Sequence, residues 1–206
     1  MTTQPERMKD HWWWRPGWDV GRRFYTWHLT FDGQTDVHRA AAAYREGLAE
    51  LPDLTLIPNR WLHLTMQGIG FVNEVDENTI QDIASAAATR LAQVPPAEVE
   101  LGPAVIHPEA ILLPARPEKP IHAVRNAIRA AIGDVLDDVP ERAEGFTPHV
   151  SVAYNAADRQ TEPVAQALAQ LDIPPAKAHI TSAELIMLHR DNRMYEWTPH
   201  TQVPLG

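Results

Sequence analysis

The chain has no cysteine among its 206 residues. This absence excludes a disulfide scaffold, a thiol nucleophile and any zinc or iron–sulfur site that depends on cysteine ligands. It also fits a reducing compartment, and we expect a cytoplasmic protein.

Long apolar segments are missing as well. No apolar run approaches the roughly 20 residues that a membrane-spanning helix needs, and the polar first ten residues contain no apolar signal core. We therefore expect a soluble protein with no membrane partner.

Basic residues are scarce. The chain has 18 Lys and Arg against 27 Asp and Glu, which gives a formal net charge of −9. Proteins that bind long nucleic acids usually have a basic surface, so we do not expect duplex nucleic acid as a partner. A short or terminal nucleotide bound at a local basic patch stays compatible with this charge.

Two common hydrolase signatures are absent. The three serines lie outside any G-x-S-x-G elbow. The ten histidines form neither an H-E-x-x-H pattern nor a dense cluster with aspartates. These absences weigh against serine-hydrolase and metal-hydrolase chemistry, and we expect neither a metal ion nor a cofactor.

The length and the 44% hydrophobic content predict one substantial core. Each half of the chain shows the order strand, helix, histidine-bearing strand, helix, strand. We therefore predict an α/β (α+β) fold in which two similar halves, one lobe each, bring one histidine strand each to a shared groove, forming a single domain over 24–206. The expected helices are 36–51, 77–94, 120–136 and a short one after Thr161, and the expected strands are 24–31, 54–57, 61–66, 98–106, 110–114, 147–152, 178–188 and 195–203.

Two of the predicted strands, one in each half, read alike. Each has a histidine and a hydroxyl residue two positions apart, His63 with Thr65 and His149 with Ser151. Because strand side chains alternate between faces, imidazole and hydroxyl project from the same side. If the strands lie side by side, one imidazole can take a proton from a nucleophile and the other can protonate a leaving oxygen, while the hydroxyls bind a phosphate.

The pattern H-x-[ST] occurs four times, starting at His28, His63, His149 and His179. Only His63 and His149 lie on strands between two helices, at equivalent places in the two halves. His179 is expected to be structural. His28 projects away from the apolar face of the first strand and is a candidate for lining the groove.

Residues 1–23 form a tryptophan-rich extension. The run H-W-W-W-R-P-G-W at 11–18 has no helix or strand period, and its Pro-Gly pair predicts a turn. We expect the tryptophans to pack across the main domain. The alternative is that an indole and an arginine contact a base at the mouth of the groove, with Trp14, Arg15 and Arg22 as candidates.

The paired H-x-[ST] motifs, 86 residues apart, and the duplicated order of elements resemble the 2H phosphoesterase superfamily. Within it the sequence is similar to the bacterial 2′-5′ RNA ligase-like branch, which includes cyclic nucleotide phosphodiesterases. The resemblance covers residues 24–203. It implies a bilobal fold with antiparallel sheets around a central cleft. It also implies a metal-independent phosphodiesterase that opens the 2′,3′-cyclic phosphate, or a related cyclic phosphoester, of a nucleotide or an RNA end, with 2′-5′ RNA ligation in some members. We expect a monomer.

The resemblance also implies residue roles. His63 and His149 become the acid–base pair, and Thr65 and Ser151 the phosphate ligands. We assign His149 as base and His63 as acid, with the reverse order left open. Tyr154 stands where many ligase-like members carry an arginine, so its hydroxyl or an arginine from elsewhere would replace that contact. The candidate arginines are Arg15, Arg22, Arg23 and Arg60.

A non-catalytic module that binds a nucleotide or an RNA end in the same cleft is the alternative function. Tight binding of a cyclic nucleotide without product would support it.

Overall fold

The computed structural model describes residues 4–206. Its helices are α1 (Thr35–Leu48), α2 (Glu77–Leu91), α3 (Glu118–Gly133) and α4 (Glu162–Ala169), with a 3-10 turn η1 (Asn59–Trp61). The strands up to the middle of the chain are β1 (Arg7–Met8), β2 (Phe24–Thr30), β3 (Leu54–Leu56), β4 (His63–Phe71), β5 (Ala97–Leu101), β6 (Val105–His107) and β7 (Ala110–Arg116). The later strands are β8 (His149–Asn155), β9 (Arg159–Gln160), β10 (Ala176–Ile180), β11 (Ser182–His189) and β12 (Glu196–Pro204).

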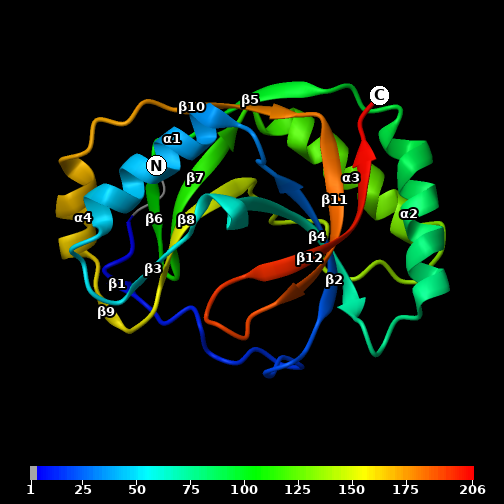
Figure 1. The fold of residues 1–206 in the computed structure, drawn as a ribbon, viewed down its shortest axis with the longest axis horizontal. Helices are drawn as coiled ribbons and strands as arrows, with labels where there is room; N and C mark the ends of the chain where they lie inside the picture. Colours follow the sequence, from blue (N-terminus) through cyan, green and yellow to red (C-terminus); the bar gives the residue numbers. More distant parts are fainter. Residues whose placement is uncertain (1–3) are drawn as a thin grey trace.

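Two antiparallel sheets form the centre of the molecule. The first lobe consists of the sheet β12-β11-β2-β4 with α2 and α3 packed on it. The second lobe consists of the sheet β10-β5-β7-β8-β3, with β6 added to β7, and carries α1 and α4. Figure 1 shows the helices at the two ends and the sheets between them. The α+β class and the antiparallel sheets are as predicted.

The two lobes are not the two halves of the chain. Helix α1, β3 and β5 come from the first half but belong to the second lobe, whereas α3 from the second half packs on β4 of the first. The last strands, β11 and β12, return to the first lobe. The expectation of one lobe per half is therefore wrong: the halves exchange elements, and the chain crosses between the lobes several times.

Two of the predicted strands are each divided. The segment 98–106 breaks at Gly102 and Pro103 into β5 and β6, because proline cannot donate a ladder hydrogen bond. The segment 178–188 breaks at Thr181 into β10 and β11, which belong to different sheets. By contrast, β4 is longer than the predicted strand 61–66 and continues through Gly68 and Gly70 to Phe71.

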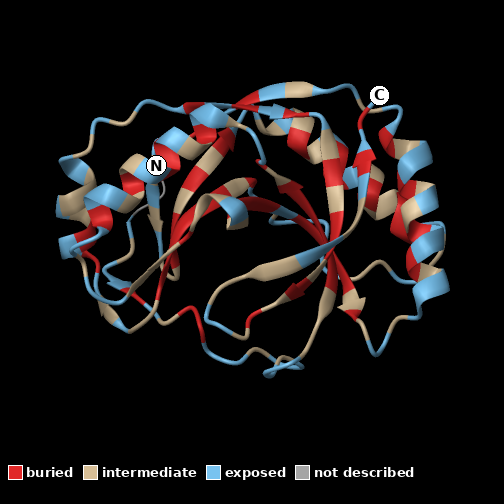
Figure 2. Ribbon diagram, viewed as in Figure 1, coloured by how far each residue is buried: buried red, intermediate tan, exposed pale blue. Residues whose placement is uncertain are grey.

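The helices pack through the stripes that their periodicity predicts. On α2, Ile80, Ile83, Ala87 and Leu91 are all fully buried. Asp76 caps this helix by accepting a hydrogen bond from the backbone N–H of Thr79. Figure 2 shows the same division on the other helices, with buried residues toward the sheets and exposed residues outward. No helix within residues 4–206 is both long and apolar enough to cross a membrane.

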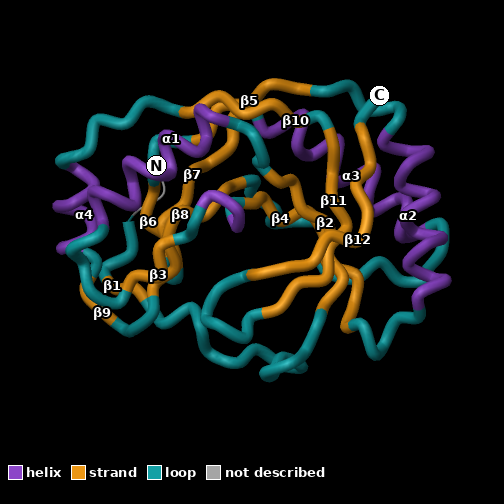
Figure 3. The backbone as a smooth tube through the Cα atoms, in the orientation of Figure 1, coloured by secondary structure: helices purple, strands orange, loops and turns teal. Residues whose placement is uncertain are grey.

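The N-terminal segment runs along one side of both lobes. It begins at the short strand β1, which pairs with β9, and reaches β2 through a stretch without regular structure (Figure 3). His11 N–H donates to the carbonyl of Asn155 in the second lobe. The ring of Trp18 packs against Phe24 on β2 and Phe71 on β4 of the first lobe. We call residues 9–18 the strap, because they connect the two lobes.

Candidate active site

A cavity of about 430 Å³ lies between the lobes, a volume typical of small-molecule sites. Strands β4 and β8 approach each other here, although they belong to different sheets. The two motifs predicted to meet therefore do share one groove. The cavity is lined by His11, Arg15, Trp18, Phe24, Thr26, His28, His63, Thr65, His107, Glu109, Ala110, Leu112, Glu141, His149, Ser151, Tyr154, Leu188 and Tyr195.

Both histidine strands are irregular at the same place. Along β2 and β4, Trp27 pairs with Gln67 and His28 with Thr65, which leaves Met66 as an extra residue. Along β7 and β8 the register shifts between Ile111 and Leu112. The extra residue of β8 is likewise the one that follows its hydroxyl residue. Bulges of this kind re-aim side chains and are frequent beside active sites.

The imidazoles of His63 and His149 are oriented in the same way. Nδ1 of His63 lies 2.8 Å from the carbonyl oxygen of Trp61, and Nδ1 of His149 lies 2.7 Å from that of Thr147. Because a carbonyl only accepts, each Nδ1 carries the hydrogen and donates. In the neutral ring, Nε2 is then the nitrogen left to take up a proton.

The surroundings favour the neutral form of both rings. Burial lowers the pKa of His63 to about 4, while the bond to Trp61 raises it and nearby His149 lowers it further. Burial also lowers the pKa of His149, and the bond to Thr147 opposes this shift. Both rings are therefore ready to act as bases at neutral pH.

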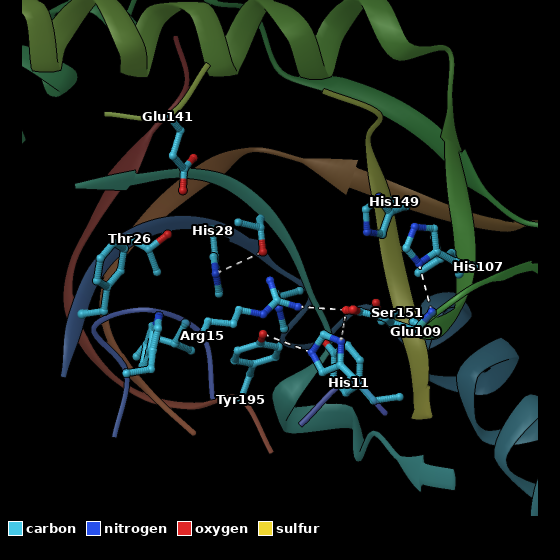
Figure 4. A pocket seen from close by; sticks show the side chains of 18 residues that line it. His11, Arg15, Thr26, His28, His107, Glu109, Glu141, His149, Ser151 and Tyr195 are labelled. Carbon is cyan, nitrogen blue, oxygen red and sulfur yellow. Dashed lines mark hydrogen bonds and ion pairs between the residues drawn. The ribbon is translucent and has the colours of Figure 1, made fainter. Parts of the chain in front are cut away.

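His28 lies behind the first motif. It is fully buried, and its ring stacks on His63 with centroids 4.3 Å apart and planes 5° from parallel. Nε2 of His28 and the hydroxyl of Thr65 lie 3.4 Å apart (Figure 4). Burial, and then the charge of His63, lower the pKa of His28 well below its ordinary value. His28 thus borders the cavity as a neutral support for both motif residues.

Hydroxyl groups enter the cavity from both strands. Thr65 is exposed to it from β4, while Ser151 and Tyr154 are mostly buried on β8. Burial and then Tyr195 raise the pKa of Tyr154. Its phenol therefore stays protonated and can donate a hydrogen bond.

The strap forms a further wall of the cavity. Nδ1 of His11 donates to Glu109 at 3.1 Å, and Nη2 of Arg15 donates to the same carboxylate at 2.9 Å. Nε2 of His11 lies 3.1 Å from the hydroxyl of Tyr195 on the β11–β12 hairpin. Burial, followed by the charge of Arg15, lowers the pKa of His11 to about 3, so the neutral ring accepts the hydrogen bond of Tyr195.

Two candidate contacts from the extension lie elsewhere. Trp14 is half exposed and borders a separate shallow cavity, and Arg22 pairs with Glu74 at 2.7 Å. Neither residue is among those that line the cavity, so the structure does not place these two candidates in the groove. Trp18 lines it instead.

Several cavity residues were missed in the sequence. Glu109 lies in the turn between β6 and β7, and Glu141 in the loop before β8, where its carboxylate accepts hydrogen bonds from Gln67 and the N–H of Gly68. Tyr195 lies on the far hairpin. None belongs to a motif, and they approach the histidines only through the exchange of elements between lobes.

No group of three or more His, Cys, Asp or Glu side chains within residues 4–206 is arranged to hold a metal ion. The chemistry that the cavity residues can supply is acid–base catalysis by imidazoles and hydrogen bonding to an anion.

The comparison with protein-family models identifies one family. The model of the 2′-5′ RNA ligase superfamily matches residues 34–193, which is most of the chain. No curated protein matches the sequence.

Solved structures share the fold. TT0787 of Thermus thermophilus has a TM-score of 0.67 at 16% identity, with 88% of this chain and 97% of that chain covered. LigT of Escherichia coli in complex with 3′-AMP has a TM-score of 0.66 at 15% identity, with 89% and 98% covered. LigT in complex with phosphate gives a TM-score of 0.63 at 15% identity over the same shares.

Proposed function

The chain belongs to the 2′-5′ RNA ligase superfamily, and from this premise we propose that it hydrolyses a cyclic phosphodiester. The expected substrate is the 2′,3′-cyclic phosphate of a nucleotide or of an RNA 3′ end. The binding of 3′-AMP by LigT supports a nucleotide substrate, because a 3′-phosphate is one product of opening such a ring.

The observation that carries the proposal is the matched pair of imidazoles. His63 and His149 come from different sheets, line one cavity, and each donates Nδ1–H to a backbone carbonyl two residues earlier. The two Nε2 atoms supply the base and the acid that an in-line displacement at phosphorus needs. Each proton transfer is typically worth about 10²–10⁴ in rate.

In the proposed reaction, one imidazole takes a proton from water as its oxygen bonds to phosphorus. The other imidazole protonates the ribose oxygen as its bond to phosphorus breaks. Thr65, Ser151 and the protonated Tyr154 donate hydrogen bonds to the non-bridging oxygens, where negative charge increases.

The electrostatics favour His63 as the base. Its pKa falls to about 4, whereas His149 is less buried, and no comparably large shift acts on it. His149 is therefore better able to hold a proton, and we assign it as the acid. This reverses our preference from the sequence.

The experiment is incubation with the four 2′,3′-cyclic mononucleotides in EDTA, with products identified by phosphorus NMR. We expect a 2′- or 3′-monophosphate, because no step needs a metal ion. Strict dependence on a divalent cation would contradict the mechanism. Tight binding without any product would favour the binding module, and incubation with RNA ends tests whether ligation also occurs.

A further inference from the structure

A phosphate anion in this cavity needs a positively charged side chain, because acidic residues line it. Two carboxylates, Glu109 and Glu141, line the cavity. Burial favours the neutral forms of His63 and His149. Among the lining residues of the described chain, only Arg15 has a permanent positive charge. Apart from the proton that the acid His149 holds during the reaction, Arg15 is therefore the cation that the described lining residues offer to a phosphodiester anion.

Arg15 is placed for that role. Figure 4 shows its side chain extending across the cavity, between the strand of His28 and the strand of Ser151, toward Glu109. Its Nη2 bonds to Glu109, but its Nε is buried without a hydrogen-bond partner within residues 4–206. A buried N–H group without an acceptor is unfavourable, and a phosphate oxygen would satisfy it.

We propose that Arg15 binds the phosphate of the substrate, which makes the strap a part of the active site. Only the identity of the anion rests on the function proposed above. A guanidinium can donate two parallel hydrogen bonds to two phosphate oxygens, a geometry that a lysine cannot offer. The free Nε edge of Arg15 would face the phosphate while Nη2 remains on Glu109.

Glu109 has a positioning role in this arrangement. Besides Arg15, its carboxylate accepts hydrogen bonds from two other strap side chains, Nδ1 of His11 at 3.1 Å and Nε1 of Trp13 at 3.3 Å. The turn between β6 and β7 thus fixes the strap and aims the guanidinium. The same negative charge competes with a bound phosphate for Arg15.

The other arginines near the strap have different partners. Arg22 pairs with Glu74 at 2.7 Å and Arg23 with Asp191 at 2.9 Å. Arg190 donates to two backbone carbonyls of the strap. These arginines stabilise the segment, and none of them lines the cavity.

The test is a calorimetric titration of the wild type and four variants with inorganic phosphate. The variants are Arg15→Gln, Arg15→Lys, Glu109→Gln and the control Arg22→Gln. We expect Arg15→Gln to weaken phosphate binding by about 10- to 100-fold, the range for a lost hydrogen bond to a charged group. Arg15→Lys should retain part of the affinity, and Arg22→Gln all of it.

Glu109→Gln separates binding from a structural role. It breaks the same ion pair as Arg15→Gln but leaves the guanidinium in place. Because the amide oxygen of glutamine can still accept the hydrogen bond from Nη2 of Arg15, the guanidinium keeps its position, and we expect phosphate binding to be unchanged or tighter. If Glu109→Gln weakened binding as much as Arg15→Gln, the pair would only hold the strap, and the proposal would be wrong. Wild-type affinity in Arg15→Gln, or no binding by the wild type at millimolar phosphate, would also overturn it.

Phosphate binding needs no turnover, so the result is independent of the proposed reaction. Loss of affinity in Arg15→Gln without hydrolysis of any cyclic phosphate would support the role of Arg15 and reject the reaction. Hydrolysis of a cyclic phosphate with an unchanged KM in Arg15→Gln would support the reaction and reject the role of Arg15.

Discussion

Arg125 on α3 connects the first histidine strand to the loop that precedes the second. Its guanidinium is buried and donates to the carbonyls of Met66 at 2.8 Å and of Ala143 and Arg142 at 2.9 Å each. It also lies over the ring of Phe146, 4.5 Å from the centroid. Arg125→Met removes all three hydrogen bonds and keeps much of the apolar packing.

The expected loss of unfolding free energy in Arg125→Met follows from these contacts. A hydrogen bond from a charged donor is worth about 1.5–3 kcal/mol, which sets a gross loss of about 5–9 kcal/mol. Against this, no carboxylate within residues 4–206 forms an ion pair with Arg125, and burial lowers its pKa. Methionine therefore recovers a part of the desolvation free energy. We expect a net destabilisation of about 2–4 kcal/mol.

Urea unfolding monitored by circular dichroism measures this free energy, with Arg39→Gln as the control. Arg39 is exposed and pairs with the exposed Asp36, three residues earlier on α1, so its loss should cost less than about 0.5 kcal/mol. Arg125→Met should also lower activity, because the loop that it releases leads directly to His149. An Arg125→Met protein as stable as the Arg39→Gln control would show that these three hydrogen bonds do not stabilise the fold.

Two further predictions concern the histidines. In the other lobe a leucine, Leu112, pairs with Ser151 as His28 pairs with Thr65, so His28→Leu should keep the fold. We expect kcat to fall about five- to tenfold at similar KM, because about 1 kcal/mol of interaction with His63 and Thr65 is lost. An unchanged kcat would show that His28 only fills space. The profile of kcat/KM against pH should be bell-shaped with its maximum below pH 6.5. Activity rises as the base His63 loses its proton near pH 4, and it falls as the acid His149, whose pKa is also lowered, loses its proton. A maximum on the alkaline side would contradict the assignment.

Local patterns predicted the elements well. The stripe Ile80, Ile83, Ala87 and Leu91 has helical spacing and is buried as expected, because a face of this kind has to pack against something apolar. The alternation around His63 predicted which side chains face the groove.

The changes of sheet left little trace in the sequence. At Thr181 and Ser182 two polar residues follow each other and the alternation changes phase, and there β10 ends in one sheet and β11 begins in the other. Alternation indicates which face of a strand is buried and carries no information about the partner strand. For the same reason, the exchange of α1 and α3 between the lobes could not be predicted.

The candidate site was predictable only in part. His63, Thr65, His149 and Ser151 were found because a repeated pattern marks them. Glu109 has no such signal. Its place beside the strap depends on the contact with Arg15, which lies 94 positions away in the sequence.

In the proposed reaction, His63 and His149 act together on a phosphodiester. The most direct test compares hydrolysis of a 2′,3′-cyclic mononucleotide in EDTA by the wild type, His63→Ala, His149→Ala and the control His179→Ala, which removes the histidine of an H-x-T pattern outside the cavity. We expect the first two variants to lose at least about 100-fold in kcat/KM with the fold preserved, and the control to keep wild-type activity. Activity that persists in both His63→Ala and His149→Ala would show that the catalytic pair lies elsewhere.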